Sequence, residues 1–138
     1  MPLVEKRLNP SDPARYHYLE PGAPEDVRRA IFNNADHVAA RLRNLTNCLE
    51  AVMTWSQVLA AAGIPHALLG RQGTSDHGGY LEPGSDKTTD HHYLAVGHGL
   101  YLFDPTAGQF EQPVTPERYV VADGTPFVKW RIHQLQRP

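Results

Sequence analysis

The chain has 138 residues, of which 41% are apolar and 20% are charged, and its formal net charge is −2. A chain of this length can bury a sizeable core, so we expect residues 1–138 to form one domain with an irregular lead-in over residues 1–23. The charge gives no basic field for nucleic acid, and no apolar run approaches the roughly 20 residues that a membrane span needs. We expect neither nucleic acid nor a membrane as a partner.

The single cysteine, Cys48, excludes an intramolecular disulfide. Near the N-terminus, Glu5, Lys6 and Arg7 stand where a signal peptide would carry its apolar core. These features favour a reducing, cytoplasmic setting, unless the chain is part of a longer exported effector. The sequence carries no signal for the oligomeric state.

The first predicted element is a helix from Pro24 to near Arg43. Proline suits the first helical turn, and acidic residues follow it where they complement the helix dipole. The apolar residues that recur at helical spacing and should face the core are Val27, Ile31, Val38 and Leu42.

A second helix is predicted from the Asn47-Cys48 pair to about Ala62. Asn47 is a good N-cap, Glu50 stands three residues later as in a capping box, and Gly63 is a typical C-terminal stop. Apolar residues spread around most of the circumference of this helix. We therefore expect it to be central and buried.

Cys48 would occupy the first position of this second helix. Free backbone N–H groups and the positive end of the helix dipole favour a thiolate there over a thiol, and the same groups can hold an oxyanion. Asn47 is accordingly a candidate for an oxyanion or substrate contact. The alternative is that Cys48 is a small buried hydrophobe, as free cysteines often are.

The second half of the chain predicts an antiparallel sheet of four or five strands. A strand is expected over Pro65–Leu69, and the glycine-containing polar stretch Arg71–Thr89 is expected to be a long loop. Two strands, Tyr93–Val96 and Leu100–Asp104, flank the turn Gly97-His98-Gly99 and should pair as a hairpin.

A second hairpin is predicted near the C-terminus. Its arms would be Tyr119–Ala122 and Phe127–Ile132, joined by the turn Asp123-Gly124-Thr125-Pro126. With the two helices that come before, the expected fold class is α+β.

A cysteine nucleophile needs a base that takes its proton and a group that orients the base. Antiparallel pairing across the glycine turn would set Asp104 opposite either His91 or His92, depending on the length of the turn. The hairpin therefore predicts an imidazole–carboxylate contact, with the choice of histidine left open. His92 shares a strand face with Leu94. The alternation of side chains along the strand, taken alone, therefore favours His92 as the partner of Asp104.

Three segments together resemble a known family. They are Asn47-Cys48 at a helix start, Asp90-His91-x-Tyr93-Leu94, and Asp104-Pro105-Thr106-Ala107-Gly108-Gln109-Phe110. Their order and spacing are similar to the Cys, H-x-[WY] and D-P-T segments of the transglutaminase-like branch of the papain-like cysteine enzymes. The size of the chain is closest to the small stand-alone bacterial members. The resemblance covers residues 47–110, about half of the chain.

This resemblance implies a papain-like/transglutaminase-like core in which the cysteine helix packs on the antiparallel sheet. It also implies a thioester at Cys48, with His91 as the base and Asp104 as the orienting group, and it makes Tyr93 a candidate substrate contact. His92 remains the alternative base. In papain a glutamine upstream of the cysteine helps to form the oxyanion hole, and we do not expect Gln57 or Gln109 to replace it.

The expected function is that of a cysteine-dependent hydrolase or acyl transferase that acts on an amide, either in a peptide or in a glutamine side chain. A protein or peptide substrate and no cofactor are expected. One alternative is a glutamine deamidase toxin or effector domain. Others are a catalytically inactive binding module and a zinc site built from some of His77, His91, His92, His98 and Asp104.

Overall fold

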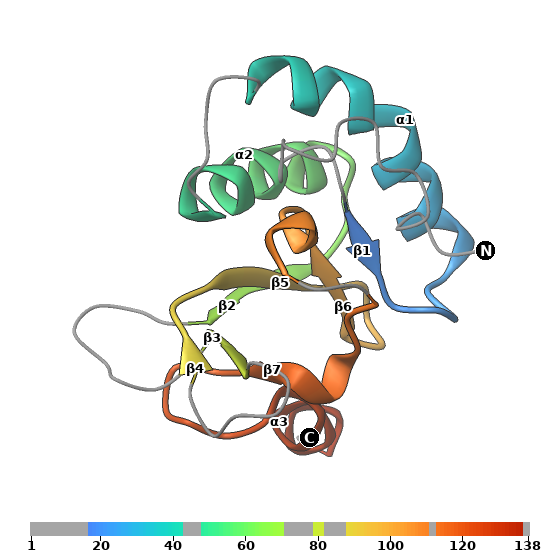
Figure 1. Cartoon of the computed structure of the whole chain (residues 1–138). Helices are drawn as coiled ribbons and strands as arrows, with labels where there is room; N and C mark the ends of the chain where they lie inside the picture. The colour runs from blue at the N-terminus through green and yellow to red at the C-terminus, as the bar shows by residue number, and fades with distance from the viewer. Residues whose placement is uncertain (1–16, 43–47, 71–78, 82–87, 111–112, 137–138) are drawn as a thin grey trace.

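A computed structural model describes residues 17–42, 48–70, 79–81, 88–110 and 113–136. In these residues three helices and two antiparallel sheets form an α+β fold (Figure 1). The helices are α1 (Glu25–Arg41), α2 (Cys48–Ala61) and α3 (Phe127–Leu135), with the 3₁₀ turns η3 (Ala107–Gln109) and η4 (Pro116–Arg118). The strands are β1 (Tyr18–Leu19), β2 (His66–Gly70), β3 (Gly79–Leu81), β4 (Thr88–Thr89), β5 (His92–Val96), β6 (Tyr101–Asp104) and β7 (Tyr119–Val120). Within the described segments, no helix is long and apolar enough to cross a membrane.

The four-stranded sheet, in the order β1-β6-β5-β2, lies in the middle of the molecule. Helices α1 and α2 cover one face of it, while the three-stranded sheet β4-β3-β7 and helix α3 lie on the other side (Figure 1). Strand β5 is apolar on both faces: Leu94 and Val96 join the core under the helices, and Tyr93 and Ala95 join the core shared with the second sheet. A strand covered on both faces reads as a continuous apolar run.

The first predicted helix is confirmed as α1. Pro24 precedes its first turn, and Glu25 and Asp26 lie in that turn, where their charges favour the helix dipole. The four apolar residues that were expected to face the core are all buried: Val27, Ile31, Val38 and Leu42.

Helix α2 begins at Cys48 and ends before Gly63, whose positive φ of 73° suits a helix stop. Asn47 lies outside the described residues, so its predicted capping role is not described. The expectation that α2 would be buried around most of its circumference is wrong. Leu49 and Met53 are 42% and 50% exposed, because only one face of α2 packs on the sheet. That face presents Ala51, Val52, Trp55 and Leu59.

The central hairpin is confirmed, but its register differs from both predicted ones. Val96 lies opposite Tyr101, so four residues connect the strands instead of two or three. Leu100, placed in the strand by the prediction, adopts a φ of 57° and belongs to the connection. Continuing the register by one pair sets Asp104 beside Tyr93, and the prediction that it would lie opposite His91 or His92 is wrong.

The sheet is also divided differently from the prediction. The expected single sheet of four or five strands is two sheets, one of four strands and one of three. Strand β1 lies within the expected irregular lead-in, and β3 and β4 lie within the expected loop Arg71–Thr89. These strands contain only two or three residues each, too few to show alternation in the sequence.

The predicted C-terminal hairpin is wrong, because Phe127 begins helix α3 and not a strand. Pro126 stands at the N-cap of this helix, a start at which its missing N–H costs nothing. The prediction of a strand rested on the turn Asp123-Gly124-Thr125-Pro126 between two segments. The helix instead packs Phe127 and Trp130, three residues apart, against the core shared by the two sheets.

Candidate active site

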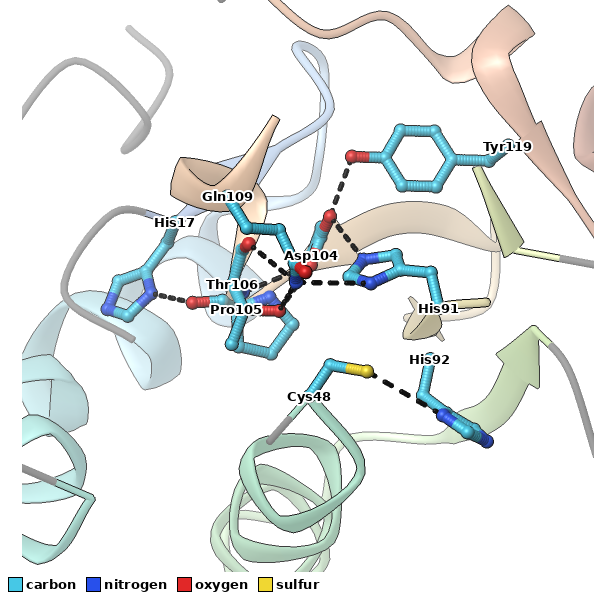
Figure 2. A network of polar contacts seen from close by, with 9 residues as sticks. All are labelled: His17, Cys48, His91, His92, Asp104, Pro105, Thr106, Gln109 and Tyr119. Carbon is cyan, nitrogen blue, oxygen red and sulfur yellow. Dashed lines mark hydrogen bonds and ion pairs between the residues drawn. The ribbon is translucent and has the colours of Figure 1, made fainter. Parts of the chain in front are cut away.

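Cys48 is the first residue of α2, and its side chain is neither fully buried nor fully exposed. Its sulfur lies near the imidazoles of His91 and His92 (Figure 2). The Sγ atom is 3.7 Å from Nδ1 of His92, and it also interacts with His91, whose hydrogen bonding and charge lower the pKa of the thiol. The position that the sequence predicted for the thiol, at a helix start beside histidine, is therefore the one observed.

His91 is completely buried and immediately precedes β5. Its Nε2 atom is 2.7 Å from Oδ2 of Asp104, which is also completely buried. Because a carboxylate only accepts hydrogen bonds, Nε2 carries the proton, and Nδ1 is left to face the thiol. Figure 2 shows the three side chains in this order, from Asp104 through His91 to Cys48.

The hairpin register explains why His91 meets Asp104. Asp104 lies beside Tyr93 and shares its face of the sheet, and His91 lies two residues before Tyr93 on the same face. His91 and Asp104 are thus diagonal neighbours, close enough for long side chains to touch. His92 belongs with Leu94 on the opposite face, toward the helices. The alternation of side chains along the strand therefore places His91, and not His92, on the same face as the Asp104 carboxylate.

Two glycines let neighbouring strands approach the backbone of His91. Gly70 has a φ of 102°, and a Cβ atom there would lie 2.0 Å from the His91 carbonyl oxygen. Gly79 has a φ of 107°, and its Cβ atom would lie 2.8 Å from the His91 nitrogen. Any larger residue would push His91 out of place.

Asp104 is surrounded by hydrogen-bond donors. Besides His91, Tyr119 donates its hydroxyl to Oδ2 at 2.7 Å, and the backbone N–H of Thr106 donates to Oδ1 at 3.0 Å. The Thr106 hydroxyl adds a longer contact to Oδ1 at 3.5 Å. Burial, together with the charge of Asp104, raises the pKa of Tyr119 well above its usual value, so its hydroxyl stays protonated. The surroundings suit an acceptor-only carboxylate.

The site lowers the pKa of the Cys48 thiol and raises the pKa of the His91 imidazole. Burial alone would lower the pKa of His91, but the charge and hydrogen bond of Asp104 outweigh it, with help from Cys48, and raise the pKa of His91 to about 9. Burial alone would raise the pKa of Cys48, but the hydrogen bond and charge of His91 outweigh it and lower that pKa. These shifts favour a thiolate–imidazolium pair.

The other predicted site residues have different surroundings. Tyr93 is completely buried; its ring stacks on the His91 ring at 6.2 Å, and its hydroxyl has no hydrogen-bond partner among the described residues. This position supports His91 and does not favour a substrate contact. His98 lies in the exposed connection of the hairpin, and His77 lies outside the described residues. Among the described residues, no three metal-ligating side chains converge.

Sequence reasoning missed four side chains of this network: His17, Thr106, Gln109 and Tyr119. Thr106 had a signal, because an aspartate followed two residues later by a backbone donor forms a local turn. His17 fixes the same turn from a distance, with its Nδ1 atom 3.0 Å from the carbonyl oxygen of Pro105. Tyr119 is fifteen positions from Asp104, and no local pattern marks it.

Removing the Asp104 carboxylate should destabilise the protein. Asp104→Ala would leave buried His91 without its partner, and we expect the free energy of unfolding to fall by about 3–5 kcal/mol. Urea unfolding of this variant, of His91→Ala and of the double variant gives the coupling energy of the pair. A double variant whose loss equals the sum of the two single losses would contradict a direct interaction.

Comparison of the chain with protein-family models, with curated proteins and with solved structures gave no match. The function must therefore be inferred from the arrangement of Cys48, His91 and Asp104.

Proposed function

We propose that the protein is a cysteine-dependent acyl-transfer enzyme, a hydrolase or transferase that attacks an amide through a thioester at Cys48. The substrate amide belongs to a peptide bond or to a glutamine side chain, and the core is of the papain-like/transglutaminase-like kind that the sequence resemblance implies. The observation that carries the proposal is the buried His91–Asp104 pair, whose second imidazole nitrogen, Nδ1, faces a thiol at a helix start.

The proposed reaction uses these three residues in two half-reactions. The Cys48 thiolate attacks the amide carbonyl carbon, and the resulting tetrahedral intermediate collapses as the His91 Nδ1–H protonates the leaving amine or ammonia. The thioester is then attacked by water or by an amine. His91, neutral at this stage, takes the proton of the attacking group, and the thiolate leaves.

Asp104 supports both half-reactions without changing its own protonation. Its contact with Nε2 holds the imidazole in the tautomer that leaves Nδ1 for the thiol, and its charge stabilises the imidazolium. Buried among donors, it keeps this orientation without competition from water. Deamidation is the form of this chemistry in which ammonia leaves and water attacks.

The proposal is tested by mass spectrometry of peptides incubated with the wild type and with Cys48→Ala. The peptides contain glutamine, and parallel samples include a primary alkylamine. Conversion of the amide to the acid indicates deamidation, an amine adduct indicates transamidation, and new peptide termini indicate a peptidase. Changes that appear equally with Cys48→Ala would contradict the proposal, as would the absence of any change when peptides and a cell extract are both supplied.

A further inference from the structure

Gln109 is an exposed residue whose amide is nevertheless held in one place. It ends η3, and its Nε2 atom lies 2.9 Å from Oγ1 and 3.2 Å from the carbonyl oxygen of Thr106. The same nitrogen lies 3.3 Å from Nδ1 of His91. Because a backbone carbonyl can only accept, the NH₂ end of the amide must face this cluster.

Gln109 and Cys48 compete for the same imidazole nitrogen. Neutral His91 has one lone pair on Nδ1, and it can accept a hydrogen bond from the Gln109 amide or from the thiol. Figure 2 shows both side chains approaching the His91 ring from different directions. When the thiol proton moves to Nδ1, that atom becomes a donor, and the N–H of Gln109 loses this acceptor.

We propose that Gln109 is a catalytic residue whose N–H, released when the Cys48–His91 ion pair forms, stabilises the oxyanion of the tetrahedral intermediate. This inference rests on the proposed function. The amide stays anchored at Thr106 and needs no large movement to offer its second hydrogen to a new acceptor beside the thiolate. The donor therefore becomes available in the same state in which the nucleophile is active.

Asp104 positions both the base, His91, and the residue that anchors Gln109, which is Thr106. One carboxylate oxygen, Oδ2, holds His91, and the other, Oδ1, accepts the backbone N–H and the hydroxyl of Thr106. The Thr106 hydroxyl donates to Asp104 and accepts from Gln109, so its direction is fixed at both ends. From the sequence alone we did not expect Gln109 to serve as an oxyanion donor, and its contact with His91 is the observation that favours this role here.

The test compares two reactions of the same thiol in Gln109→Ala and Gln109→Glu. Acylation of Cys48 by 4-nitrophenyl acetate passes through an oxyanion, whereas alkylation by iodoacetamide does not. We expect both variants to lower the acylation rate by about 10²–10³-fold, the usual effect of removing one oxyanion donor, and to change the alkylation rate far less. Gln57→Ala, an exposed glutamine on α2, is the matched control and should change neither rate.

Wild-type acylation rates in the Gln109 variants would overturn the inference and leave the proposed function standing. Equal losses in acylation and alkylation would also overturn it, because they would mean that Gln109 acts by holding His91 and not by binding the oxyanion. If the wild-type protein is not acylated at Cys48 at all, the proposed function itself fails. Circular dichroism and urea unfolding show separately whether each variant keeps its fold.

Discussion

Cys48→Ala is expected to lower the rate of amide hydrolysis or transfer by about 10⁴-fold or more. The thiolate is the group that forms the covalent intermediate, and no other described side chain at the site can replace it as a nucleophile. The free energy of unfolding should change little, because Cys48 is only partly buried and alanine is a good helix former at the start of α2. Turnover with the substrate identified by mass spectrometry, and urea unfolding, measure the two effects.

Cys48→Ser is the matched control for this first prediction. It keeps the size of the side chain and the hydrogen bond to His91, but a hydroxyl forms an anion far less readily than a thiol does. We expect almost as large a loss in turnover as with alanine. Activity near that of the wild type in either variant would show that the chemistry takes place elsewhere.

His91→Ala is expected to remove nearly all turnover, by a factor on the order of 10⁴, because the base and its imidazolium charge are lost together. His92→Ala should cost about tenfold or less, since His92 contacts the sulfur but does not share the strand face of Asp104. The two residues are adjacent in sequence, and each contacts the thiol, so they form a matched pair. Rates with the same substrate measure the difference.

The opposite result for the two histidines would transfer the role of base to His92. That outcome would mean that the thiol transfers its proton to the partly exposed His92, 3.7 Å away. The buried His91–Asp104 pair would then have only a structural role. Equal and small losses in both variants would contradict acid–base catalysis by either histidine.

Short-range patterns predicted a large part of this fold and of its site. Helix spacing and caps located α1 and α2, and the glycine turn located the β5–β6 hairpin. The hairpin also predicted that a histidine would meet Asp104, because two strands joined by a short turn must pair. The two predicted registers were wrong by one and two residues, since Leu100 takes a left-handed conformation that a leucine seldom adopts and so lengthens the connection.

The rest depends on contacts between residues that are distant in sequence. Strands β3 and β7 pair although they are about forty residues apart in sequence. Their pairing places Tyr119 beside Asp104 and Gly79 beside the backbone of His91. Such short strands form because neighbouring strands satisfy their backbone groups, not because of their own residues. The role inferred for Gln109 depends on a turn that folds back on His91 and was likewise not readable from spacing.

The most direct test of the central claim is the rate at which iodoacetamide alkylates Cys48, measured as a function of pH. It requires no knowledge of the substrate. Because the pKa of Cys48 is lowered, the thiolate and its reactivity should persist at pH values below the ordinary thiol pKa of 9.0. A second change is expected near pH 9, where His91 loses its proton.

In His91→Ala the thiolate loses its partner, so the reactivity of Cys48 should follow a single titration at a higher pH than in the wild type. The wild type should therefore react faster than this variant near neutral pH. A single ordinary thiol titration, identical in the wild type and in His91→Ala, would contradict the ion pair and with it the proposed mechanism.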